Sequence, residues 1–153
     1  MPLWVVYHPP GTFSDDESKQ AFSKSATSFY TSKGLPAFYV IVEFIQLNTN
    51  NTWIGGEKQD PNKPFVRIAI DHIARSMPDT DEYRLNATAR LEELLKPHIA
   101  DKGWKYEYHI DETDRRLWRI DGYVPPPTGS EAEQLWFSKN HAVPYDTEAT
   151  VAN

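Results

Sequence analysis

Apolar and polar positions follow one another in blocks along the chain, and the blocks predict strands and helices in a regular order. Residues 3–7 form a continuous apolar run rich in β-forming residues, which is typical of a short buried strand. Over residues 14–33, apolar side chains recur at helical spacing, and Gly34 with Pro36 marks the end of the helix. A second apolar run over 38–45 predicts another strand. Because a helix connects the two strands, we expect them to pair in parallel.

Two polar features refine this first unit. Ser14 and Glu17 have the spacing of a capping box, in which each side chain satisfies a backbone donor of the other residue. The strand over 38–45 is apolar on both faces apart from Glu43, and this pattern predicts a position inside a sheet. Glu43 would then be a buried carboxylate that needs compensation, for example by an arginine.

The same order of blocks recurs in the second half of the chain. An apolar run over 65–70 predicts a strand, and Asp79 with Glu82 predicts the start of a helix that ends near Ile99. Residues 104–110 alternate between apolar and polar as a third long strand. The recurrence predicts a second β-α-β unit.

The two units together suggest the fold. Short hairpin strands are expected at 53–56 and 117–124. We predict an α+β fold with a mixed sheet, made of two fused β-α-β units over about 2–56 and 65–124. Both units belong to a single domain over residues 2–128.

A stiff segment of three prolines, Pro125 to Pro127, leads out of this domain into a C-terminal arm over 129–153. Residues 130–140 have the spacing of a short amphipathic helix, which we expect to pack on its own domain or on a neighbouring subunit. The polar tail from about Asp146 is predicted to be disordered.

Composition excludes several classes of protein. The 153 residues carry a net charge of −6, which argues against a nucleic-acid partner because such a partner needs a basic surface. The absence of cysteine excludes thiolate ligands, and no two histidines have the spacing of metal ligands. With no phosphate-binding or dinucleotide-binding motif, we predict neither a metal nor a cofactor. The chain shows no secretory signal and no membrane-spanning stretch, so we expect a cytoplasmic protein with no membrane partner.

Pro2 is the clearest candidate for a catalytic residue. Methionine aminopeptidase cleaves before small residues, so removal of Met1 would leave a proline at the amino terminus, directly before the predicted strand over 3–7. Strand pairing would hold this secondary amine in place. An α-amino group has a pKa of roughly 7.7–8.0, and burial or a neighbouring cation lowers it. An ordered amine of this kind is a candidate general base or nucleophile.

Polar residues at the ends of other elements are candidates to surround the amine. His72 and Arg75 follow the strand over 65–70, and ligands gather beyond strand ends in parallel sheets. Arg75 is suited to bind a carboxylate through two N–H groups, although the alternative is a solvated loop residue. Tyr30 lies on the apolar face of the first helix, either as a core aromatic or with its hydroxyl directed into the site.

Two more candidates end the third long strand. Tyr108 and His109 are consecutive, so the alternation of a strand puts them on opposite faces of the sheet. At most one of the two therefore points toward a given site.

Four stretches of the chain, combined with the spacing of the predicted elements, carry a resemblance to a known family. They are Pro2-Leu3-Trp4-Val5-Val6-Tyr7, Thr52-Trp53-Ile54-Gly55-Gly56, residues 65–75 and Gly122-Tyr123-Val124-Pro125. On these stretches the chain resembles the tautomerase superfamily, whose members fold as β-α-β units and use an amino-terminal proline for chemistry. It is most similar to the cis-3-chloroacrylic acid dehalogenase group, and within it to oxalocrotonate tautomerase-like proteins of filamentous fungi. The resemblance covers residues 2 to about 140.

The resemblance implies roles for individual residues. The catalytic proline of the family matches Pro2, and a histidine on the first helix of the dehalogenase falls on Tyr30. Its second arginine after the third strand matches Arg75, while His72 stands near the position of the first. Arg75, helped by His72, would then bind the substrate carboxylate.

Later positions depart from the dehalogenase. Its tyrosine from the late strand falls on Tyr108 or His109, either of which, like Tyr30, would stabilise an enolate oxygen. Its water-activating glutamate falls on residues 119–120, an arginine and an isoleucine, so Asp121 or Glu112 would have to replace it. The resemblance therefore favours tautomerisation over hydrolytic dehalogenation.

We predict a cofactor-independent tautomerase, an isomerase that moves a proton within a 2-oxo acid or another enolisable carboxylate. Pro2 would act as its base, and the resemblance implies a homotrimer with one site per chain. Two alternatives remain. If Pro2 is cationic at working pH, the site suits a hydratase or dehalogenase-like lyase acting on unsaturated acids. If the amine has no role, the chain is a non-catalytic ligand-binding α+β barrel or an inactive tautomerase homologue.

Overall fold

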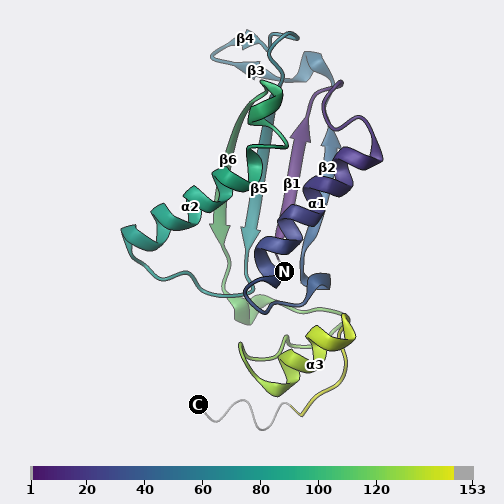
Figure 1. Cartoon of the computed structure of the whole chain (residues 1–153), viewed down its shortest axis with the longest axis vertical. Coiled ribbons are helices and arrows are strands. Elements are labelled where there is room, and N and C mark those ends of the chain that lie inside the picture. The colour runs from purple at the N-terminus through teal and green to yellow at the C-terminus, as the bar shows by residue number, and fades with distance from the viewer. Residues whose placement is uncertain (1, 147–153) are drawn as a thin grey trace.

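Four strands form one mixed sheet in the computed structural model, which describes residues 2–146 (Figure 1). In the order in which they lie side by side, the strands are β2 (Ile41–Gln46), β1 (Leu3–His8), β5 (Phe65–His72) and β6 (Lys105–Glu112). β1 pairs with β2 in parallel, as β5 does with β6, whereas the two central strands, β1 and β5, are antiparallel. The sheet is therefore built from two β-α-β units joined side by side, as the sequence predicts.

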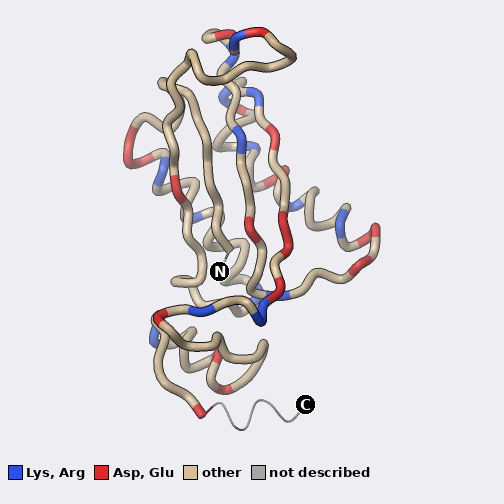
Figure 2. Tube along the Cα trace, turned by 180° about the vertical axis from the view of Figure 1, so that it is seen from behind, with Lys and Arg blue, Asp and Glu red and all other residues tan. Residues whose placement is uncertain are grey.

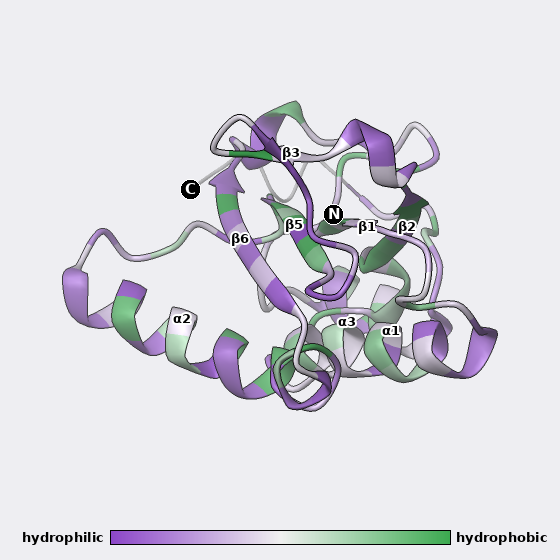
Figure 3. Ribbon diagram, turned by 90° about the horizontal axis from the view of Figure 1, so that it is seen from above, coloured by the Kyte–Doolittle hydropathy of each residue, from purple (hydrophilic) through white to green (hydrophobic). Residues whose placement is uncertain are grey.

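Two long helices, α1 (Asp16–Thr31) and α2 (Asp81–Leu95), cover one face of this sheet, and each connects the parallel strands of its own unit (Figures 1 and 3). A third helix, α3 (Glu131–Lys139), lies beyond one end of the strands, at the bottom of Figure 1. The shorter elements within residues 2–146 are a hairpin of β3 (Trp53–Ile54) and β4 (Glu57–Lys58) and the 3-10 turns Ala37–Tyr39, Thr49–Asn51, Ala100–Lys102 and Arg115–Leu117.

The core lies between the sheet and the two helices. Alternate residues of the central strands, such as Trp4 and Ile68, are fully buried there, because successive side chains of a strand point to opposite faces. Phe22 of α1 and Leu91 of α2 meet them from the helical side. Burial of one such side chain contributes about 1.5–3 kcal/mol to folding, so this layer holds the two units together.

No helix of the described residues 2–146 covers the other face of the sheet (Figure 2). Where β1 and β2 form it, this face is largely apolar, with Leu3, Val5, Tyr7 and Ile41 partly buried and Ile45 exposed. Where β5 and β6 form it, Phe65 and Ala69 stand among the charged or polar residues Arg67, Asp71, Lys105, Glu107, His109 and Asp111. β2 lies at the edge of the sheet, and the prediction of an interior strand is wrong because apolar residues on this uncovered face imitate burial on both faces. Glu43, paired with Val5, is exposed on it and needs no compensating arginine.

Several predicted boundaries also differ from the structure. Asp15, rather than Ser14, caps α1, and its side chain accepts a hydrogen bond of 2.7 Å from the backbone N–H of Ser18. Thr80 caps α2 in the same way. That helix ends at Leu95 instead of near Ile99, because Pro97 cannot continue it.

The region over 117–124 is a tight turn rather than the predicted strand. A single bridge joins Ile120 to Tyr123, and Asp121 between them has a φ of 49°, which no extended strand permits. The described part of the arm, residues 129–146, folds back on its own chain. Ser130 caps α3, and the Trp136 side chain of α3 is fully buried against Tyr39.

The tail predicted to be disordered lies outside the described residues, apart from Asp146. Among residues 2–146, no helix is long and apolar enough to cross a membrane.

One buried and two partly buried histidines are expected to make the free energy of unfolding depend on pH. Burial lowers the pKa of His8, His72 and His98 below their ordinary value of 6.5, so the folded protein keeps these rings neutral where the unfolded chain takes up protons. Their contribution to stability is complete above about pH 6.5 and is lost as the pH falls toward the lowered pKa values, by about 1.4 kcal/mol for each pKa unit.

We therefore expect the urea midpoint to fall between pH 7.5 and 5.5, and His8→Asn to reduce that dependence. His8 is 1% exposed, whereas His141 is exposed, so His141→Asn serves as the control and should retain the wild-type slope. A midpoint that does not change with pH in the wild type would contradict the prediction.

Candidate active site

The directions of the elements bring several chain segments to one end of the sheet, where strands begin or end; this is the lower end in Figure 1. β1 and β2 begin there, whereas β5, β6 and α1 end there. The residues just beyond these ends come from distant parts of the sequence, and α3 lies next to them. The sequence predicts a site at this end of the sheet, because Pro2 precedes β1 and Arg75 follows β5.

Pro2 is buried and held by strand pairing. Its carbonyl accepts a hydrogen bond of 3.0 Å from the backbone N–H of Ile41. In the antiparallel pairing of β1 with β5, Leu3 lies opposite Asp71, so the next position in register places Pro2 opposite His72. The backbone at the start of β1 is therefore fixed between β2 and β5.

Tyr30 and His72 form a stacked pair beside this position. Their ring centroids lie 6.0 Å apart with an angle of 25° between the planes, and the Tyr30 hydroxyl accepts a hydrogen bond of 3.1 Å from the indole N–H of Trp4. Burial raises the pKa of Tyr30 to about 12, so the hydroxyl stays protonated and keeps a proton to donate. Tyr30 is therefore both a core aromatic and a potential donor.

His72 is a neutral ring at neutral pH. Burial lowers its pKa, and the Glu112 carboxylate, which acts in the opposite direction, does not overcome that effect. Lys33 lowers the pKa of His72 further. His72 is consequently suited to a hydrogen bond with a substrate rather than to an ion pair with its carboxylate.

Lys33 is a residue of the candidate site that the sequence analysis does not identify. It lines a narrow hollow with Tyr30 and His72, and also a wider one of about 500 Å³ with Arg75 and Glu133, so it links the two. Its ammonium lies 3.9 Å from the centroid of the Phe29 ring. Burial, followed by the charges of Arg90 and Arg75, lowers the pKa of Lys33. The available signal was its place three residues after Tyr30, one helical turn farther along.

Arg75 faces the wider hollow, where its side chain is 31% exposed. Arg115 fixes the preceding residue by donating hydrogen bonds to the carbonyls of Ala74 and Pro126, which ties the segment after β5 to the proline segment that leads into the arm. A guanidinium and an ammonium on one hollow, next to a neutral imidazole and a phenol, form an arrangement that suits a carboxylate with an adjacent polar oxygen.

Tyr108 and His109 lie on opposite faces of β6, as the alternation requires. Tyr108 faces α2, where its hydroxyl lies 3.4 Å from the Thr88 carbonyl, and it lines a hollow of about 280 Å³ that shares Met77 with the hollow at His72. Burial raises the pKa of Tyr108 to about 12. His109 points to the uncovered face, with its ring nitrogens 3.1 Å from Arg67 and 3.1 Å from Asp111.

The carboxylates considered for water activation have other surroundings. Glu112 accepts a hydrogen bond of 3.0 Å from the backbone N–H of Met77 and lies near His72. Asp121 is exposed in its tight turn, and Arg119 donates to backbone carbonyls of its own segment. Within residues 2–146, no group of three or more histidine and carboxylate side chains is placed to hold a metal ion.

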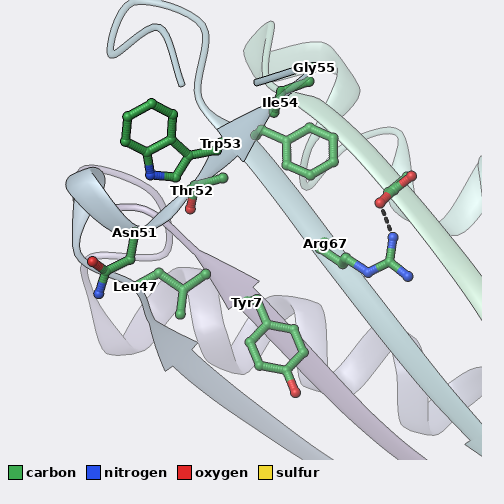
Figure 4. Close-up of a pocket in the computed structure, with 10 residues that line it drawn as sticks. Tyr7, Leu47, Asn51, Thr52, Trp53, Ile54, Gly55 and Arg67 are labelled. Carbon is green, nitrogen blue, oxygen red and sulfur yellow. Dashed lines mark hydrogen bonds and ion pairs between the residues drawn. The ribbon is translucent and has the colours of Figure 1, made fainter. Parts of the chain in front are cut away.

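A further hollow of about 560 Å³ lies on the uncovered face, near the end of the strands opposite to the candidate site (Figure 4). Tyr7 and Trp53 line it, together with Arg67, which forms an ion pair with Glu107. Tyr7 stands near the end of β1, and Pro2 precedes its start, so this hollow is separate from the candidate site.

Residues 1–141 match the protein family described as "Putative oxalocrotonate tautomerase enzyme". Native RhCC from Rhodococcus jostii RHA1 is 40% identical, with a TM-score of 0.86 over 94% of this chain and 99% of that one. A protein of the thermophilic fungus Aspergillus fumigatus, described as "a probable enzyme", is 38% identical, with a TM-score of 0.84 over 95% and 98% of the two chains. N1, a member of the cis-3-chloroacrylic acid dehalogenase family, shares the fold at 17% identity, with a TM-score of 0.66 over 90% and 97%. Among curated proteins, none matches the chain.

Proposed function

The chain belongs to the oxalocrotonate tautomerase family that its residues match, and we propose that it is a cofactor-independent tautomerase of 2-oxo acids or other enolisable carboxylates. The observation that supports this most directly is the arrangement of residues at the end of the sheet where β1 begins. There the backbone of Pro2 lies opposite His72, and the hollows that Tyr30, Lys33 and Arg75 line meet at Lys33.

The proposed reaction needs one base and a place for the substrate's charges. With Met1 removed and its amine neutral, Pro2 takes the proton of an enol hydroxyl, and the protonated amine returns a proton to the far carbon of the C=C bond as the C–O bond becomes a carbonyl. The reverse reaction uses the same two transfers in the opposite order. Arg75 and Lys33 bind the carboxylate. The Tyr30 hydroxyl, which keeps its proton, donates to the oxygen on which negative charge develops.

The proposal includes assembly as a homotrimer. The uncovered face of the sheet is apolar at Val5, Tyr7, Ile41 and Ile45, the last of which is 40% exposed, and subunit contacts would remove this surface from water. His109, which points to this face, would then approach a neighbouring subunit, whereas Tyr108 faces α2. The fused 4-OT protein Q0, which shares the fold at 16% identity, is described as a symmetric trimer.

Ketonisation of phenylenolpyruvate, followed by ultraviolet absorbance, tests this function directly. The purified protein, with removal of Met1 verified by mass, should accelerate the reaction well above buffer. Sedimentation of the same preparation should give three times the mass of the 17.6 kDa chain. A rate equal to that of buffer would overturn the tautomerase proposal, and a monomeric mass would overturn the trimer.

A further inference from the structure

A buried carboxylate from the C-terminal arm reaches the hollow at Arg75. Glu133 of α3 is 3% exposed, and its Oε2 atom lies 3.7 Å from a terminal nitrogen of Arg75. The same oxygen accepts a hydrogen bond of 2.7 Å from the backbone N–H of Gly129. The contact joins helix α3 to the residue that the proposed function uses for the substrate carboxylate.

The side chains of Glu133 and Arg75 make only some of the hydrogen bonds that they could make. Oε1 of Glu133 and Nε of Arg75 are both buried, and neither has a hydrogen-bond partner within residues 2–146. At 3.7 Å, the contact itself is longer than a hydrogen bond. Replacing buried ion pairs by apolar side chains often leaves stability unchanged or raises it, so stability alone is a weak reason for a glutamate here.

Charge suggests a different reason. Three charged side chains line the hollow of about 500 Å³, namely Lys33, Arg75 and Glu133, and its other lining residues, such as Gln134 and Phe137, are uncharged. The lining therefore carries one net positive charge, which matches a ligand with one negative charge. Without Glu133 it would carry two, which would favour a ligand with two.

We propose that Glu133 is a specificity-determining residue that sets the hollow at Arg75 and Lys33 for monocarboxylates and against dicarboxylates. The inference rests on the proposed function for the view that substrates bind here. The charge that it assigns to the hollow does not depend on the reaction.

Direct binding therefore tests the inference apart from catalysis. The probes are phenylacetate, with one negative charge, and phenylsuccinate, with two, and calorimetric titration gives both dissociation constants. In Glu133→Gln we expect phenylsuccinate to gain about tenfold over phenylacetate relative to wild type, because an opposing charge within a few ångströms has been removed. Lys33→Gln should shift the ratio in the opposite direction.

Glu131→Gln is the matched control. Glu131 belongs to the same helix and loses the same charge, but it is exposed and does not line the hollow, so the ratio should stay at the wild-type value. Circular dichroism verifies folding, and if Glu133→Gln does not fold, the same ratio in Lys33→Gln, a change at a partly buried position, tests whether the charge of the hollow sets the preference.

The outcomes separate the two proposals. An unchanged ratio in Glu133→Gln, or an equal change in Glu131→Gln, would overturn the role of Glu133 while leaving the tautomerase proposal intact. Charge-dependent binding without ketonisation would leave the inference standing and remove the proposed reaction. A wild type that binds neither acid would overturn the inference as well.

Discussion

Pro2→Ala should lower kcat for enol-acid ketonisation about a hundredfold or more and leave KM within a few-fold of wild type. General acid–base catalysis contributes about 10²–10⁴-fold to a rate, and the substitution removes the rigid secondary amine on which the proposed proton transfer depends. Alanine is small enough for Met1 still to be cleaved, so the variant differs at the reacting nitrogen rather than in chain length. KM is expected to hold because the proposed reaction assigns the binding of the carboxylate to Arg75 and Lys33 and not to the amine.

The control for this variant is Pro10→Ala, an exposed proline in the loop after β1, which should retain the wild-type rate. The pH profile adds a second test. A catalytic amine must be neutral, so kcat/KM should fall on the acid side with a pKa at or below the roughly 7.7–8.0 of a free α-amino group. Wild-type kcat in Pro2→Ala would show that the reaction does not need the secondary amine of proline and would contradict the proposed role of Pro2.

The helices and strands of the fold could be predicted because the spacing of apolar residues within each segment largely determines them. Phe22 and Tyr30 recur at helical spacing on one face of α1, and both are buried. Trp4 and Ile68 lie in apolar runs that are strands. The parallel pairing of β1 with β2 followed from the connecting helix, and the structure confirms it.

What the sequence analysis missed depends on contacts between distant segments. Glu133 stands in the first turn of a helix, where acidic residues are favoured for local reasons, and its burial arises only because α3 packs on the chain. Lys33 looked like an ordinary residue at a helix end. The edge position of β2 was hidden because the uncovered face of the sheet is apolar at Ile41 and Ile45, although no described element covers it.

Because Trp136 is buried against the domain, we expect residues 129–146 of the arm to unfold together with the sheet, and Trp136→Ala tests this with a large effect on stability. Trp136 is fully buried, contacts the rings of Phe38 and Tyr39, and donates a hydrogen bond of 2.8 Å from its indole N–H to the Val143 carbonyl. Truncating a buried tryptophan to alanine costs about 3–5 kcal/mol, so we expect the free energy of unfolding in urea to fall by that amount.

Leu135→Ala on the same helix is the matched control. Leu135 is 40% exposed, and removing its side chain should cost less than about 1 kcal/mol. If the arm and the sheet unfold together, Trp136→Ala keeps a single transition with an unchanged m-value and a lower midpoint. A separate early transition that leaves the main midpoint at its wild-type value would show that α3 is only loosely attached. In that case Glu133 would not be held at Arg75, and the charge of the hollow would no longer be set by the arm.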